Sequence, residues 1–291
     1  MALMMLAMVF VPVLDLFAKL LAVDYAVIQV TWARFVFHGL WLLPLLAWKG
    51  VVWWRMPNQP VFQLLRSLML TITTVAFFYA IKDNPIPTAL TLLFVSPLIV
   101  AIFAPVLLGE SFDIARGIAV VLGFLGVLVV LRPTTDSFSP TILWALLAGI
   151  SYAFYIMFTR KLSASGPPLL TLFYTAIGGV LVLTPLVGSV WQTPNLTGLV
   201  MMASMGLFAA IGHFLIIMAC EYATASQLSP FNYFEIVAAT AISYFAFDFF
   251  PDVYVWVGIA IICTSGAYVS WRELQLSKKA RAIHDGRIDI V

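Results

Sequence analysis

The stretch IPTALTLLFVSPLIVAIFAPVLLGE, residues 86–110, decides the class of fold. Its first 23 residues carry no charged side chain, and a helix of about 20 apolar residues is long enough to cross the hydrocarbon core of a bilayer. The rest of the chain has the same character, because 63% of its 291 residues are apolar, 10% are charged and the mean hydropathy is +1.05. Soluble domains carry about 25% charged residues. The composition therefore predicts an all-α integral membrane protein.

Division at charges, prolines and polar clusters gives ten apolar segments of this kind. They cover about 2–22, 27–48, 60–81, 86–108, 113–131, 140–160, 168–188, 196–219, 223–247 and 252–271. The first segment has no basic region before it and no small-residue cleavage site after it, so we expect a membrane span and not a cleaved signal. The loops are too short for a folded soluble domain. We therefore expect ten transmembrane helices.

The basic residues indicate how these segments are oriented. One set of loops, together with the C-terminal tail, holds eleven Lys and Arg residues, with Arg66 counted among them just inside its segment. The opposite set holds Lys82 and Arg132. Cytoplasmic loops are enriched in Lys and Arg. We therefore expect a multi-pass protein of the cell (inner) membrane with both termini in the cytoplasm.

An internal repeat appears when the sequence is shifted against itself by about 140 residues. Residues 117–119 then fall on residues 258–260, both Gly-Ile-Ala, and with a shift of three Pro97 falls on Glu235. Five helices cross a membrane an odd number of times, so a second copy enters from the other side, an inverted arrangement typical of transporters. Chance alignment of apolar helices is the alternative. The predicted parts are residues 1–133 (first repeat), 138–272 (second repeat) and 273–291 (a basic cytoplasmic tail).

The same residues resemble a known family. Ser96-Pro97 in the fourth segment, Gly109-Glu110 at its end and the glycines of the fifth look like the EamA-type members of the drug/metabolite transporter superfamily. The resemblance implies ten helices in two inverted five-helix repeats. The second half departs from the pattern, with Phe234-Glu235 where Ser-Pro is expected. Residues 13–22 and 32–46 are similar to YddG-like bacterial exporters of aromatic amino acids, although these motifs do not encode a substrate.

Several classes of function lack the motifs that they need. The sequence has no nucleotide-binding G-x-x-x-x-G-K-[ST], no G-x-S-x-G and no H-E-x-x-H. Its three histidines lie far apart, and Cys220 and Cys263 lie in apolar stretches without a pairing pattern. We therefore expect no metal, no cofactor and no disulfide. The net charge of +2 argues against a nucleic-acid partner. A lipid-acting membrane enzyme and a non-transporting scaffold remain less favoured alternatives to a transporter.

Ionisable residues within apolar segments are candidates for coupling or gating, because a charge in the membrane is costly. Asp15 and Arg34 lie at similar depth in neighbouring segments, so we expect them to form a buried pair, with Lys19 extending outward. His38 follows Arg34 by one helical turn. Structural pairing and coupling both remain open for the pair, as do packing and proton transfer for His38.

The ninth segment carries polar groups near its middle. Glu235 follows Asn232 by three residues, and Pro230 precedes both. In the fourth segment, Pro97 lies beside Ser96. Each proline removes a helical hydrogen bond, and interrupted backbone in a membrane is tolerated where it faces protein or a water-filled cavity. We therefore expect both segments to line a central substrate cavity. A hydrogen-bonded, protonated scaffold role is the alternative for Glu235.

Faces that mix aromatic and hydroxyl groups suit an amphipathic ligand. The remaining predicted cavity residues are Trp144, Tyr152, Tyr155, Thr74, Phe78 and His213. Helix packing is the alternative for each. Tryptophans at segment ends predict interfacial belts, at Trp53, Trp54, Trp191 and Trp271. The small residues Ala119 and Gly123 permit close helix approach, within a monomer or in a weak homodimer.

These observations together predict a secondary active transporter that works by alternating access. The resemblance implies export of small amphipathic metabolites, namely amino acids with aromatic or bulky apolar side chains. A carrier of sugars, nucleotide-sugars or organic cations is the alternative within the same superfamily. The expected partners are the small-molecule substrate and the lipid bilayer.

Overall fold

The computed structural model describes residues 1–51, 58–84, 86–110, 114–131, 141, 143–163, 165–247 and 253–284. All regular structure in these residues is helical. The helices that cross in one piece are α1 (Ala2–Leu21), α2 (Val27–Trp48), α3 (Pro60–Asp83), α6 (Ile114–Leu131), α7 (Leu143–Leu162), α8 (Pro168–Val187), α9 (Leu196–Tyr222) and α12 (Val253–His284). The other two crossings are interrupted. They consist of α4 (Ile86–Leu93) with α5 (Ser96–Leu108), and of α10 (Ala225–Leu228), the 3-10 helix η4 (Ser229–Tyr233) and α11 (Phe234–Phe247).

The prediction of a ten-helix integral membrane protein is confirmed. By length and composition, six of the described helices could each span a bilayer: α1, α2, α3, α7, α8 with the 3-10 turn η3 (Gly188–Val190) that follows it, and α9. Shorter apolar helical stretches cover Ser96–Leu108, Gly117–Val129 and Trp256–Tyr268. Large apolar side chains such as Leu6, Val106 and Phe245 are exposed on the outer surface, where lipid would cover them.

Local sequence signals fix several helix ends. Prolines begin α3 and α8, where the missing backbone N–H has no helical partner to lose. The Asn195 side chain accepts a hydrogen bond of 2.7 Å from Gly198 N at the start of α9. Thr224 and Gln227 form a capping box at the start of α10. Gly109 ends α5 with φ of 66°, the left-handed conformation that favours glycine.

The two interrupted crossings have a common cause. Pro97, at the start of α5, cannot donate to the Leu93 carbonyl, and α4 ends at that residue. The Leu92 carbonyl accepts from Val95 N at 3.2 Å. The carbonyls of Leu92 and Leu93 both face Gly149 of α7, where an added Cβ would lie only 2.8 and 2.7 Å from them. In the other crossing, Pro230 lies in η4, and the Ser226 carbonyl accepts from the Ser229 hydroxyl at 3.2 Å. Both prolines interrupt their helices, as predicted.

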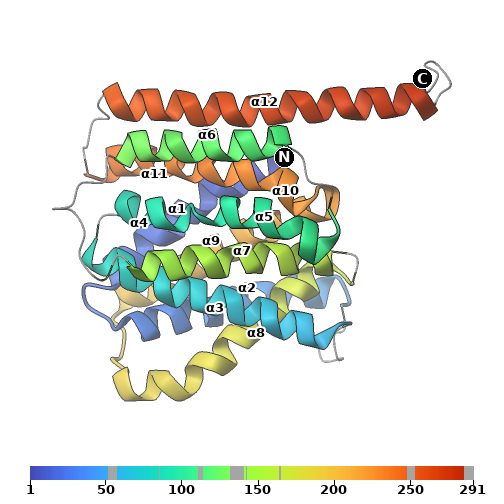
Figure 1. The fold of residues 1–291 in the computed structure, drawn as a ribbon. Coiled ribbons are helices and arrows are strands. Elements are labelled where there is room, and N and C mark those ends of the chain that lie inside the picture. Colours follow the sequence, from blue (N-terminus) through green and yellow to red (C-terminus); the bar gives the residue numbers. More distant parts are fainter. Residues whose placement is uncertain are drawn as a thin grey trace.

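Four helices form the centre of the bundle. α1 packs along α9, and α3 packs along α7, whereas α1 touches α3 only lightly and α7 touches α9 only lightly. The centre therefore consists of two helix pairs, α1/α9 and α3/α7. Figure 1 shows α6 and α12 side by side at one edge of the molecule and α8 at the opposite edge. After ten crossings Met1 and the end of α12 at His284 lie at one end, called here the terminal end, and the helices α1, α3, α6, α8 and α11 finish at the far end.

The predicted inverted repeat stays a prediction, although several helix bounds are separated by about 140 residues. α1 and α7 are offset by 141 residues at both of their ends. The last residues of α3 and α9 are offset by 139, and their first residues by 136. Phe94 and Tyr233, also 139 residues apart, pack edge to face with their ring centroids 5.5 Å apart.

Some details differ from the sequence prediction, and others agree with it. α12 continues as a helix to His284 instead of ending near residue 271. Arg66, counted with the loops, is fully buried inside the bundle. Gly123 packs within the chain, because a Cβ there would lie 2.4 Å from the Tyr233 ring. Trp191 is exposed at the end of η3, and Trp271 is exposed within α12 instead of at a helix end. Trp53, Trp54 and Arg132 lie outside the described residues.

Candidate functional site

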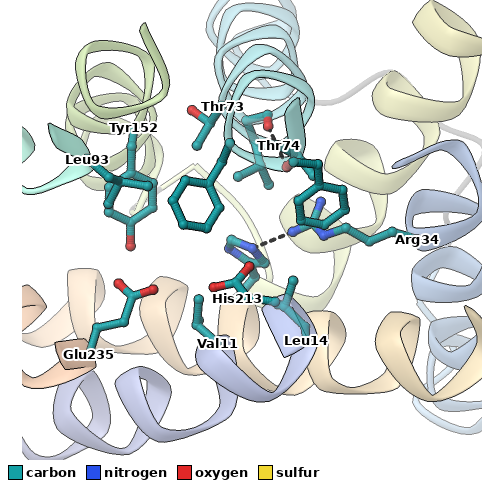
Figure 2. Close-up of a pocket in the computed structure, with 13 residues that line it drawn as sticks. Val11, Leu14, Arg34, Thr73, Thr74, Leu93, Tyr152, His213 and Glu235 are labelled. Atoms are coloured by element: carbon teal, nitrogen blue, oxygen red, sulfur yellow. Dashed lines mark hydrogen bonds between the residues drawn. The ribbon is translucent and has the colours of Figure 1, made fainter. Parts of the chain in front are cut away.

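A closed pocket lies at the middle of the bundle, between the two central helix pairs (Figure 2). Its cavity volume is about 50 Å³, well below the roughly 300–1,000 Å³ of a typical ligand site. Almost every lining side chain is buried, so this conformation is closed toward both ends. The lining residues are Val11, Leu14, Asp15, Arg34, Leu70, Thr73, Thr74, Phe77, Phe78, Leu93, Tyr152, His213 and Glu235.

The structure brings together seven of the predicted site residues in this pocket: Thr74, Phe78, Tyr152, His213, Glu235, Asp15 and Arg34. They come from both halves of the chain. Positions that match between the halves recur in the lining, since Val11 and Tyr152 are 141 residues apart and Thr74 and His213 are 139 apart. Both halves of the chain therefore contribute to this pocket at positions about 140 residues apart.

Arg34 is the central cation of the pocket. Its Nη2 donates to His213 Nε2 at 2.6 Å (dashed in Figure 2), and its guanidinium carbon lies 4.6 Å from the centre of the Phe35 ring. The Nε and Nη1 atoms are buried without a hydrogen-bond partner. Buried donors are almost always paired, and an exception at a pocket points to a bound ligand or water. Arg34 therefore presents free donors in a site that contains few other donors.

His213 connects Arg34 to a second buried arginine, Arg66, through a chain of hydrogen bonds. A guanidinium can only donate, so Nε2 accepts and the neutral ring carries its proton on Nδ1, which donates to Tyr155 Oη at 3.0 Å. Tyr155 Oη also accepts from Arg66 Nη2 at 3.3 Å. The chain Arg34–His213–Tyr155–Arg66 thus joins α2, α9, α7 and α3, and its directions require a neutral His213.

The sequence analysis did not predict that Arg66 is a buried hydrogen-bond donor. Its position near the end of a segment suggested that it belongs to a loop. Its Nε donates to Thr159 Oγ1 at 2.8 Å, and Nη1 donates to Thr171 O at 3.0 Å and also to Thr175 Oγ1. Hydroxyl and carbonyl oxygens satisfy this guanidinium in place of a carboxylate. Threonines at positions 159, 171 and 175 within apolar segments were the available signal.

The expected ion pair between Asp15 and Arg34 is not formed. Both side chains line the pocket, but no ion pair within 4.0 Å joins these two described residues, and Asp15 Oδ2 is buried without a hydrogen-bond partner. The physical reason is that His213 and Phe35 hold the guanidinium. Lys19 reaches the far end, as predicted, where its Nζ donates to Ile81 O and Asn84 O.

Glu235 lies in the first turn of α11, 3% exposed, and lines the pocket. Its carboxylate and the Tyr152 hydroxyl face one another across the cavity in Figure 2. Asn232 is buried in η4 outside the lining, and neither of its side-chain polar atoms has a partner. Ser96 and Pro97 are also buried, but neither lines the pocket. Leu93 is the residue of the fourth segment that lines it.

The remaining predicted residues surround the pocket or lie apart from it. Tyr155 is stacked behind Tyr152, with ring centroids 5.8 Å apart, and His38 is stacked behind His213 at 6.3 Å. Trp144 is 44% exposed and packs on Tyr79, away from the cavity. Sequence reasoning missed the lining residues Thr73 and Phe77 of α3. Each directly precedes a predicted residue, so a wider face of that helix would have included them.

A bundle of ten membrane-crossing helices around a closed, charged central pocket has the architecture of a small-molecule carrier. Comparison with known proteins agrees: the model of the EamA-like transporter family matches residues 1–132 and 139–271. The chain therefore belongs to the EamA-like transporter family, and the resemblance to the drug/metabolite transporter superfamily is confirmed.

Two named relatives are similar over most of the chain. An S-adenosylmethionine uptake transporter of Rickettsia bellii is 29% identical over 266 residues, which are 91% of each chain. A riboflavin transporter of Vibrio cholerae is 28% identical over 248 residues, 83% of this chain and 82% of its own. A crystal structure with a TM-score of 0.75 and 18% identity, covering 94% of this chain and 97% of the other, shows the same fold. Neither named relative is an amino-acid exporter, so the relatives support only the coarser prediction of a small-metabolite transporter.

Proposed function

We propose that this protein carries S-adenosylmethionine, or a closely related cationic amino-acid derivative, inward across the cell (inner) membrane. The observation that carries the proposal is the charge of the pocket. Asp15 and Glu235 bring two carboxylates, Arg34 brings one guanidinium, and the hydrogen bonds of His213 require its neutral form. With Asp15 and Glu235 both ionised, the form that a bound cation would favour, the formal charge of the lining is −1. At neutral pH S-adenosylmethionine has one carboxylate, one ammonium and one sulfonium group, and a net charge of +1.

The free donors of the pocket suit the carboxylate of such a substrate. Arg34 Nε and Nη1 are unpartnered, and each can donate a charge-assisted hydrogen bond to a carboxylate oxygen. The substrate carboxylate would then take the place that we first expected Asp15 to occupy. Asp15 and Glu235 remain for the ammonium and the sulfonium, because a buried charge is stable only when it is paired.

The apolar wall suits the adenine ring. Phe77 and Phe78 of α3 and Tyr152 of α7 line the pocket from the α3/α7 pair, and aromatic side chains stack favourably on a flat base. The closed pocket holds only a few waters at about 50 Å³, so the substrate would enter after the two central helix pairs separate at one end. Inward transport is proposed because the Rickettsia bellii relative is named an uptake transporter.

Export of aromatic amino acids, the expectation from the sequence, is the second candidate. The same aromatic side chains favour it. An aromatic amino acid is a neutral zwitterion, however, and would leave one pocket carboxylate without a partner. Uncharged riboflavin would supply no charged group to pair with the carboxylates of the pocket. Pocket charge therefore ranks the candidates, with S-adenosylmethionine first.

Counterflow in proteoliposomes tests this ranking. Purified protein is reconstituted with unlabelled compound inside, and labelled S-adenosylmethionine, phenylalanine, tryptophan or riboflavin is added outside. S-adenosylhomocysteine is the matched control, because it lacks only the methyl group and the sulfonium charge. We expect saturable S-adenosylmethionine counterflow and at least about tenfold weaker competition by S-adenosylhomocysteine, which corresponds to roughly 1.4 kcal/mol for the unpaired carboxylate.

Two outcomes would contradict the proposal. Equal competition by the two compounds would show that the pocket does not recognise the sulfonium. Counterflow of tryptophan without counterflow of S-adenosylmethionine would favour the second candidate. Direction is tested separately, by accumulation of labelled S-adenosylmethionine from the medium in cells that express the protein, since counterflow itself has no direction.

A further inference from the structure

A basic residue closes the space between the central helices at the far end. Lys19, near the end of α1, donates from Nζ to Ile81 O at 2.6 Å and to Asn84 O at 2.8 Å. Both carbonyls belong to the end of α3. The last carbonyls of a helix lack helical partners and attract a cation. Lys19 thus links α1 to α3, two helices that otherwise hardly touch. We call this contact the far-end bridge.

A second basic residue makes the same contact at the terminal end. Arg160, near the end of α7, donates from Nη1 to Cys220 O at 2.6 Å, at the end of α9. This terminal-end bridge links α7 to α9, the other two helices that hardly touch. Glu110 reinforces it, because its carboxylate lies 4.0 Å from Arg160 Nε and accepts hydrogen bonds from Ala225 N and Ser226 N at the start of α10.

The two bridges occupy matching places in the two halves of the chain. Lys19 and Arg160 are 141 residues apart, the offset between α1 and α7. The acceptors Ile81 and Cys220 are 139 residues apart, the offset between the last residues of α3 and α9. The same interaction therefore occurs once at each end of the bundle. Chance placement of two unrelated basic residues does not explain agreement in both donor and acceptor.

Each bridge also joins the two walls of the pocket. Val11, Leu14, Asp15 and His213 line it from the α1/α9 pair, and Leu70 to Phe78 with Tyr152 line it from the α3/α7 pair. Each bridge has its donor on one pair and its acceptor on the other. With both bridges formed the pocket is closed, which is the state of this structure.

We propose that Lys19 and Arg160 are the gate residues of the carrier, each holding one end closed while the other opens. Opening the far end requires Lys19 to leave the α3 carbonyls, and opening the terminal end requires Arg160 to leave α9. Water that enters at the opening end would solvate both partners, so each bridge can re-form. The inference rests on the carrier function and not on the identity of the substrate.

Thiol labelling from each side of the membrane tests the proposal. The parent variant carries Cys220→Ala and Cys263→Ala, which keep the backbone acceptor, and Thr74→Cys as a reporter in the pocket wall. A membrane-impermeant thiol reagent is applied to either side of oriented vesicles without substrate. We expect Lys19→Gln to raise the labelling rate from the far side about fivefold or more. Arg160→Gln should raise the labelling rate from the terminal side by a similar factor. A factor of this size is expected when one stabilising contact of the closed state is lost.

Matched controls separate bridging from charge. Lys161→Gln removes the neighbouring cation, which lies over the Phe62 ring of α3 and so makes its contact within the α3/α7 pair. Lys82→Gln removes an exposed cation at the far end. Both should label as the parent does, and Lys19→Arg should restore the parent rate. Lys19→Met, of similar length, replaces Lys19→Gln if the latter does not fold. Unchanged labelling in the bridge variants, or a rise from the same side in both, would overturn the proposal even if S-adenosylmethionine is carried.

Discussion

His213 holds the pocket guanidinium through a bond that only its neutral form can make. Nε2 accepts from Arg34 at 2.6 Å while the Nδ1 proton is directed at Tyr155, 3.0 Å away. Arg34 keeps Nε and Nη1 free because this one contact and the Phe35 ring fix its orientation. His213 therefore acts as a positioning residue, which orients the proposed carboxylate anchor without binding the substrate through its own charge.

Replacement of His213 separates positioning from packing. His213→Gln keeps a carbonyl acceptor near the position of Nε2, whereas His213→Phe keeps the ring and loses both hydrogen bonds. An unsatisfied buried donor costs roughly 1–3 kcal/mol, so we expect His213→Phe to raise the KM for S-adenosylmethionine about tenfold or more. His213→Gln should stay within about threefold of wild type. Counterflow kinetics measure both. Equal KM values in the two variants would show that the ring only fills space.

Sequence reasoning found the ionisable residues of the pocket but not how they pair. Asp15, Arg34, His213 and Glu235 are conspicuous because charged and polar groups are rare in apolar segments. The predicted partner of Arg34, Asp15, was wrong. The depth of a residue along a helix can be counted from the sequence, whereas the rotation of one helix relative to another cannot be derived from it. A helix that is apolar on all sides gives no periodicity from which to read its orientation.

The interrupted helices show what sequence can predict at the scale of elements. Pro97 and Pro230 gave the two interruptions correctly, because a missing N–H is a local property. The residues that accommodate the interruptions were not predictable, because they lie on other helices. Gly149 of α7 is one of them: it leaves room for the carbonyls of Leu92 and Leu93.

Gly149 should therefore be intolerant of even one extra carbon. Gly149→Ala places a Cβ 2.7 Å from Leu93 O, and overpacking of this kind costs roughly 1–3 kcal/mol. We expect the melting temperature in detergent to fall by about 5 °C. Gly117→Ala of α6 is the control, since a Cβ there meets no atom within 4 Å. A melting temperature unchanged in Gly149→Ala would show that α4 and α7 can move apart at no cost.

At the scale of the whole molecule, the ten crossings were predictable because every crossing needs a long run without charges. The bounds agree to within a few residues for α1, α2 and α8. The association of α1 with α9 and of α3 with α7 was not predictable, since these contacts join distant parts of the chain. They also explain why the pocket contains residues from both halves, an arrangement that the offset of about 140 residues suggested.

The orientation of the bundle in the membrane is predicted from the distribution of Lys and Arg. It has to be tested by experiment. The structure changes the count of basic residues, because Arg66 is buried in the bundle and Lys19 binds the far end of α3. Lys and Arg remain in large excess at the terminal end, so we expect that end in the cytoplasm.

Single cysteines in the Cys220→Ala, Cys263→Ala background test this orientation. Asp24 and Gly166 are exposed at the far and terminal ends, and each is a better reporter than Asn84, whose amide donates to Ala80 O and Thr141 Oγ1 in a buried position. An impermeant thiol reagent added to intact cells should label Asp24→Cys and leave Gly166→Cys unlabelled until the cells are opened. The reverse pattern would place both termini outside the cytoplasm. Inward transport would then require the far-end bridge to control release of the substrate and the terminal-end bridge to control its entry.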